Sequence, residues 1–132
     1  MMNEVWINLP VSDIDRSKAF FTAIGFSQHP RHAESREMVG LVMGTRKILV
    51  MLFPNSTFKS FTNHEIADTQ TATEVLISFD LESRDAVDAL AVKVSEAGGR
   101  TFGGPGEREG IYGFGFIDPD GHRWNAIHMK NG

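Results

Sequence analysis

The sequence predicts an α+β fold made of two modules, each with the order strand–helix–strand–strand–strand (βαβββ). Two observations support this prediction. Segments in which apolar and polar side chains alternate are followed by segments in which apolar residues recur at helical spacing. This order occurs in residues 1–53 and again in residues 74–132, with a polar segment at 54–73 between them. The modules share a pattern rather than residues, so a generic α+β sandwich with a coincidental order is the alternative.

The first module opens with a strand and a helix. Its strand shows two alternating sets of side chains: Val5, Ile7, Leu9 and Val11 against Trp6, Asn8 and Pro10. Asp13 is a suitable N-cap for the helix that follows, and Gly25 is a suitable end for it. Three short strands are then expected, at residues 26–29, 38–43 and 47–53.

The polar segment 54–73 shows neither period, and we expect it to be a linker or a lid. The second module then repeats the order, with a strand at 74–81 and a helix that Ser83 caps. Its later strands are expected at 100–102, 112–117 and 122–129. Asp118-Pro119-Asp120-Gly121 fits a type I turn, so the last two strands should form a hairpin.

The composition excludes several functional classes. The chain has 132 residues, which suits one compact domain in which the two modules share a core. Its 13 Lys and Arg residues are scattered and its net charge is −4, so we expect no nucleic-acid partner. No apolar run reaches the length of about 18 residues that a membrane span needs, and no secretory signal is visible. The absence of cysteine excludes disulfides and thiolate metal sites, and we expect a cytoplasmic protein without a membrane partner.

Two segments resemble a known family. The run NLPVSDIDRSKAFFTAIGF is similar to the strand–turn–helix of the vicinal-oxygen-chelate superfamily, and GFGFIDPDGHRWNAIHM is similar to its closing hairpin. This superfamily contains glyoxalases, bleomycin resistance proteins and extradiol dioxygenases. The resemblance covers nearly the whole chain and is closest to an uncharacterised subgroup labelled "predicted lactoylglutathione lyase". It implies that the paired βαβββ modules form a curved half-barrel around a cavity.

The resemblance also implies a divalent metal, held by His and Glu side chains from four strands and acting as a Lewis acid. The four matching positions in this chain are Trp6, Met51, Glu74 and Asn125. Tryptophan and methionine do not suit such a metal, and a neutral amide oxygen binds a transition metal weakly. Glu74 alone is a suitable ligand. We therefore expect no resident cofactor, and a divalent metal at the usual position is the alternative.

Strand alternation and the resemblance together predict which residues bind a ligand. We expect five substrate-binding residues on the cavity side: Trp6, Asn8, Met51, Tyr112 and Asn125. Phe53, Leu76, Ser78 and Phe114 are expected on the same side. Glu74 is a candidate catalytic base if it is buried without a metal, and an exposed carboxylate is the alternative. His128 is expected on the helix side, and His29 and His32 in a solvated loop.

The predicted function is the binding of a small molecule in an aromatic-lined cavity without the usual metal. The bleomycin-resistance branch implies a homodimer for such a protein. The first alternative is a metal-dependent lyase, isomerase or dioxygenase of the glyoxalase type. Two others are a metal-free enzyme that uses Glu74 with Asn8 or Asn125, and a structural dimer with a filled cavity.

Overall fold

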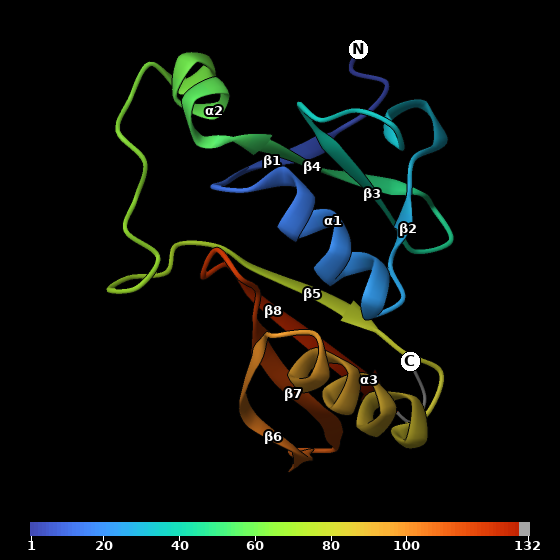
Figure 1. The fold of residues 1–132 in the computed structure, drawn as a ribbon. Coiled ribbons are helices and arrows are strands. Elements are labelled where there is room, and N and C mark those ends of the chain that lie inside the picture. Colours follow the sequence, from blue (N-terminus) through green and yellow to red (C-terminus); the bar gives the residue numbers. More distant parts are fainter. Residues whose placement is uncertain (130–132) are drawn as a thin grey trace. The chain divides into compact units, whose positions relative to one another are not determined.

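The computed structural model describes residues 1–129 of the chain. The chain divides into two compact units, of which the first is Met1–Ala67 and the second begins at Asp68. Each unit contains one four-stranded sheet (Figure 1). No helix among the described residues is both long enough and apolar enough to cross a membrane.

The first unit follows the predicted order and adds a helix. Its elements are β1 (Trp6–Val11), α1 (Ile14–Ala23), β2 (Ser27–Gln28), the 3-10 turn η1 (Pro30–His32), β3 (Val39–Met43), β4 (Ile48–Pro54) and α2 (Asn55–Thr62). The strand order in the sheet is β1-β4-β3-β2. β1 runs parallel to β4, and the other neighbours are antiparallel.

The second unit repeats this topology. Its elements are β5 (Leu76–Asp80), α3 (Arg84–Glu96), β6 (Arg100–Arg108), β7 (Ile111–Ile117) and β8 (Arg123–Met129). The strand order is β5-β8-β7-β6, with β5 parallel to β8. The prediction of two βαβββ modules is therefore confirmed.

In each unit a capped helix packs on one face of the sheet. Asp13 Oδ1 accepts a hydrogen bond from Arg16 N at 3.1 Å, and Ser83 Oγ accepts one from Ala86 N at 3.0 Å. Most of the buried apolar strand residues of the first unit belong to one alternating set: Leu9, Val11, Val39, Leu41, Val50 and Leu52. In the second unit the corresponding buried set is Phe114, Phe116, Trp124 and Ala126. The face of each sheet that is turned away from α1 or α3 is called the open face below.

Two elements differ from the sequence prediction. Residues 55–62 form α2 within the segment expected to be a linker or a lid. The Phe61 ring packs edge-on against the ring of Phe53 in β4, with 5.0 Å between the ring centroids. This contact with a preceding strand is not visible in the local polar composition. β6 also continues to Arg108, through an irregularity between Phe102 and Gly106 that carries a Gly-Gly-Pro-Gly run.

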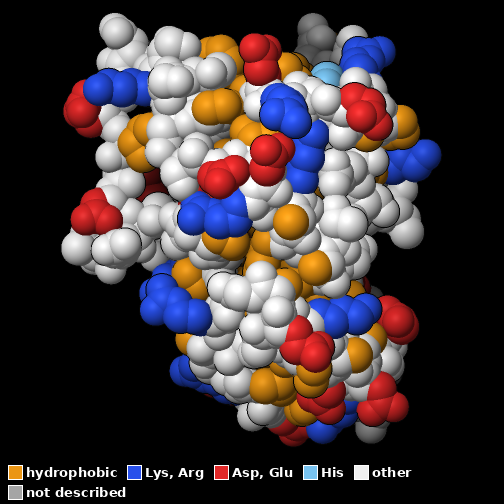
Figure 2. Space-filling view, in the orientation of Figure 1, with side chains coloured by type: hydrophobic (Ala, Val, Ile, Leu, Met, Phe, Trp, Pro, Cys, Tyr) orange, Lys and Arg blue, Asp and Glu red, His pale blue; other side chains and the backbone are white. Residues whose placement is uncertain are grey.

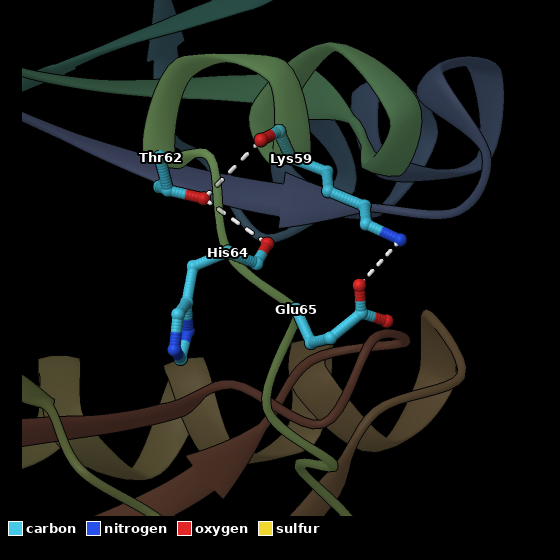
Figure 3. A network of polar contacts seen from close by, with 4 residues as sticks. All are labelled: Lys59, Thr62, His64 and Glu65. Atoms are coloured by element: carbon cyan, nitrogen blue, oxygen red, sulfur yellow. Dashed lines mark hydrogen bonds and ion pairs between the residues drawn. The ribbon is translucent and has the colours of Figure 1, made fainter.

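The end of α2 is fixed by local polar contacts (Figure 3). Asn63 takes a left-handed conformation (φ 53°) and ends the helix. The Thr62 hydroxyl lies within hydrogen-bonding distance of the carbonyl oxygens of Lys59 and His64, at 3.4 and 3.3 Å. Lys59 also forms an ion pair with Glu65 at 2.6 Å. Because both partners are exposed, this pair contributes little to stability.

Candidate functional site

The open face of the first sheet carries three of the five predicted binding residues. Trp6 pairs with Leu49 and Asn8 pairs with Met51 across the parallel β1–β4 ladder, and partners in a ladder share a face. Trp6, Asn8 and Met51 therefore lie on one face, as the alternation predicts. Trp6 is 53% exposed and Met51 is 6% exposed.

A row of side chains crosses this face from β1 to the end of β2. Met51 pairs with Asn8 on one side and with Gly40 on the other. His29 follows β2, and its backbone N–H donates to Gly40 O at 2.7 Å. A Cβ at Gly40 would lie 3.1 Å from His29 Cβ, 3.3 Å from Met51 Sδ and 3.4 Å from Cδ2 of His32. The missing side chain at Gly40 thus leaves room for both imidazoles beside Met51.

His29 and His32 were expected in a solvated loop, and the structure corrects this expectation. Both side chains are half-buried, and their ring centroids are 5.5 Å apart. The signal in the sequence was Gly40, a glycine inside an otherwise apolar strand, which often marks a close approach of another group. The turn that brings the rings there is η1, which local periodicity does not reveal.

Asn8 has the most unusual environment on this face. Its Oδ1 is buried without a hydrogen-bond partner, and no other side-chain polar atom in residues 1–129 is in this state. A buried acceptor left unpaired costs roughly 1–3 kcal/mol. His29 lies at the other end of this row, beyond Met51 and Gly40. Its Nδ1 accepts from Arg31 N at 3.1 Å, so the neutral ring carries its hydrogen on Nε2 and can donate.

The open face of the second sheet carries Asn125. Its Nδ2 donates to Ser78 Oγ at 3.3 Å, and the two residues are partners in the β5–β8 ladder. On the other side Asn125 pairs with Gly115, where a Cβ would lie 2.3 Å from Cε2 and Cζ of the Phe102 ring. Phe102 therefore covers Gly115, as His29 and His32 cover Gly40 in the first unit. The Arg123 guanidinium lies over the Phe102 ring, 4.8 Å from its centroid.

Tyr112 and Phe114 do not share a face with Asn125, and this expectation was wrong. The β7–β8 register pairs Tyr112 with His128 and Phe114 with Ala126, on the face that packs against α3. The Tyr112 hydroxyl donates to Asp88 of α3 at 2.5 Å, and this hydrogen bond raises the pKa of Tyr112 above 10.0. Alternation along β7 places its aromatic residues on one face and its glycines on the other. The pairing register with β8 decides which of these faces carries Asn125. His128 lies on the helix side, as expected.

Glu74 lies outside the strand in which it was expected. β5 begins at Leu76, and Glu74 is exposed. In the second unit, the residue equivalent to Trp6 is Leu76 and not Glu74. Trp6 precedes its helix cap Asp13 by seven residues, and Leu76 precedes the helix cap Ser83 by seven. The burial on which a role as general base depends is absent at Glu74. Its catalytic role stays a prediction.

The side chains at these positions do not fit the divalent metal of the family. The first unit offers Trp6 and Met51, and the second offers Asn125 with Leu76 at the position equivalent to Trp6. His29 Nδ1 is engaged by Arg31 N, so this ring presents a hydrogen-bond donor instead of a lone pair. Among residues 1–129, no group of three or more His, Asp or Glu side chains could hold a metal ion.

Comparison with known proteins places this arrangement in a family. Residues 5–126 match the model of the Glyoxalase/Bleomycin resistance protein/Dioxygenase superfamily, and the chain belongs to this superfamily. The repeated βαβββ fold agrees with this membership. No curated protein matches the sequence significantly.

Solved structures show the same fold. A hypothetical protein from S. aureus is 33% identical, with 97% of this chain and 95% of that chain covered and a TM-score of 0.86. A glyoxalase/bleomycin resistance protein/dioxygenase family enzyme from Burkholderia phytofirmans is 21% identical, with coverages of 94% and 96% and a TM-score of 0.77. A fosfomycin resistance protein from Mesorhizobium loti is 15% identical, with coverages of 97% and 92% and a TM-score of 0.65. The last two similarities concern the fold alone.

Proposed function

We propose that the protein binds a small molecule on the open faces of its sheets, without the divalent metal of its family. The unpaired, buried Oδ1 of Asn8 is the observation that carries this proposal. Folded proteins pair buried polar atoms because an unpaired one is costly. A ligand that donates a hydrogen bond to Asn8 would remove this cost.

The surroundings of Asn8 suit the body of such a ligand. Trp6 precedes it by two residues on the same face and is half exposed, and Met51 lies beside it in the next strand. Phe53 pairs with Pro10 further along the same face. Small-molecule sites combine such apolar surface with a few fixed polar groups. Thioether sulfur and aromatic rings also interact favourably, so an aromatic ligand is the class that we expect here.

The donor chemistry argues against a metal-dependent lyase or dioxygenase as the function. That activity would need at least three good ligands, and the corresponding side chains are apolar or neutral amides. Because members of the family are commonly dimeric, a homodimer is part of the proposal. Light scattering on the purified protein measures this property.

The experiment compares the wild type with Asn8→Leu and with Asn3→Leu, an exposed asparagine outside the strand. Metal-free protein is screened against aromatic fragments by thermal shift. Asn8→Leu should raise the Tm of the free protein by several degrees, since it removes an unpaired carbonyl worth roughly 1–3 kcal/mol. The same variant should lose the stabilisation that fragments give the wild type, whereas Asn3→Leu should change neither property.

Two results would overturn the proposal. Fragments that stabilise Asn8→Leu as strongly as the wild type would show that Asn8 is not part of the site. Stoichiometric metal in the purified protein, together with fragment binding only in its presence, would restore the metal-dependent alternative.

A further inference from the structure

The open face of the second sheet positions one arginine with unusual precision. Gly115 has no side chain, so the Phe102 ring lies over it, and the Arg123 guanidinium lies over that ring at 4.8 Å. A guanidinium stacked on an aromatic face keeps its N–H edges available to an acceptor. Arg123 is half-buried, so its charge is also less hydrated than that of a fully exposed arginine.

The charge of Arg123 has no counter-ion among the residues that the structure describes. Within residues 1–129, Arg84 pairs with Glu107 and Lys59 pairs with Glu65, but Arg123 forms no ion pair. Among the described strand residues on this face, Asp80 is the one acid. It pairs with Ile127, which follows Asn125 by two residues in β8. Figure 2 shows acidic and basic side chains interspersed over the visible surface. Arg123 is thus a half-buried cation without a counter-ion among the described residues.

The neighbours of Arg123 complete a site for an anion. Asn125 lies two residues along the same face of β8, and Ser78 pairs with it, so an amide and a hydroxyl stand beside the guanidinium. Leu76 is the direct ladder partner of Arg123 and is 52% exposed. The polar groups can donate to an oxyanion, and Leu76 with Phe102 can contact an apolar body.

Arg123 is also near a second basic residue in the register. Ile117 pairs with Arg123 on one side and with Arg100 on the other, so both arginines share the open face. Their backbones are separated by two strand spacings, or about 10 Å. Arg100 therefore adds positive potential without joining the same bidentate contact. One guanidinium fork matches one planar carboxylate better than a dianion, which needs more neutralising charge.

We propose that the open face of the second sheet binds a small organic carboxylate through Arg123, with Asn125 and Ser78 as additional donors. The inference rests on the proposed function and specifies a ligand class for it. Leu76 and Phe102 hold the apolar part of the molecule. Arg100 attracts the anion to this face.

The test is an NMR titration of ¹⁵N-labelled protein with four probes: benzoate, phenylphosphonate, inorganic phosphate and benzamide. Benzoate should shift the side-chain signals of Arg123 and Asn125, and neutral benzamide should not. Benzoate should also bind at least tenfold more tightly than inorganic phosphate, because only benzoate contacts Leu76 and Phe102. Tighter binding of phenylphosphonate than benzoate would overturn the carboxylate assignment.

Variants separate this site from general charge attraction. Arg123→Gln should weaken benzoate binding at least tenfold, and Arg123→Lys should keep part of the affinity because it retains the charge. Arg46→Gln removes an equal charge from an exposed turn of the first unit and should have no effect. Equal losses in Arg123→Gln and Arg46→Gln, or no response of Arg123 to benzoate, would overturn the inference. The amide spectrum of each variant shows whether it is folded.

The outcome is distinguishable from failure of the proposed function. Asn3→Leu, at an exposed residue outside the strands, should leave benzoate binding to Arg123 unchanged. If fragments still require Asn8 while Arg123→Gln has no effect on benzoate, only the carboxylate inference fails. If benzoate requires Arg123 while Asn8→Leu changes nothing in the fragment screen, only the assignment of Asn8 fails.

Discussion

The ring of Phe102 occupies the space that a side chain at Gly115 would fill, since a Cβ there would lie 2.3 Å from two ring atoms. The two residues are ladder partners in β6 and β7. The relationship is one of steric exclusion, because the ring and a side chain at position 115 cannot both be present. It fixes the surface on which Arg123 rests.

Gly115→Ala should therefore displace the Phe102 ring. Because the ring is the mobile end of a side chain, we expect a cost near the lower end of the overpacking range of about 1–3 kcal/mol. Urea unfolding measures this cost. The Arg123 contact with the ring should be lost, and benzoate affinity should fall. Gly106→Ala is the matched control, because a Cβ at Gly106 meets nothing within 4 Å. Equal stability of the two variants would contradict the steric relationship.

Gly40→Ala should have a milder effect in the first unit. The added methyl would lie 3.1–3.4 Å from His29, Met51 and His32, which is tight without being prohibitive. We expect the two imidazoles to shift and stability to fall by no more than about 1 kcal/mol. The imidazole carbon-bound proton signals of His29 and His32 report the shift. Unchanged signals would show that the rings do not lie over Gly40.

Tyr112 is the single tyrosine of the chain, so its ionisation can be followed by ultraviolet absorbance without interference. Its hydrogen bond to Asp88 raises its pKa above the ordinary value of 10.0. The neutral form is favoured in the folded state, so the stabilisation is present below pH 10.0 and is lost as the pH rises through the folded-state pKa. Asp88→Asn should lower the pKa of Tyr112, and Asp85→Asn should lower it less. A pKa that Asp88→Asn leaves unchanged would exclude this hydrogen bond.

Asp118 links the last turn to the buried Trp124. Its Oδ2 accepts from Trp124 Nε1 at 3.1 Å, and its Oδ1 accepts from the backbone N–H groups of Asp120 and His122 at 2.9 and 3.0 Å. Asp118→Asn would place an amide donor against one of these N–H groups. We expect a loss of about 1–3 kcal/mol in the free energy of unfolding at pH 7, measured with urea.

The pH dependence of the same pair of proteins gives a second measurement. Burial raises the pKa of Asp118 above 3.8, so the folded protein holds this proton more tightly than the unfolded chain. Protonation of Asp118 therefore stabilises the folded state. This stabilisation is fully present below pH 3.8 and is lost as the pH rises through the folded-state pKa of Asp118. The advantage of the wild type over Asp118→Asn should grow as the pH falls from neutral. An advantage that shrinks over this range would show that the pKa is lowered.

The order of the elements could be predicted because it depends on local patterns. Asp13 and Ser83 cap the helices that follow them, and the strands alternate as expected. α2 was missed because its support comes from the contact of Phe61 with Phe53. Arg123 was not singled out, because its importance depends on Phe102, a ring from another strand.

The sequence by itself determined the two βαβββ modules, the helix caps and the two sets of side chains on each strand, since all of these follow from the geometry of neighbouring residues. The pairing register between strands, which is a tertiary property, decided which set of side chains on one strand shares a face with which set on its neighbour. It placed Tyr112 against α3 and left Gly115 beside Asn125. Only the folded sheets could show that Gly40 and Gly115 lie beneath rings from another part of the chain, because the space above a glycine is filled by residues distant in sequence.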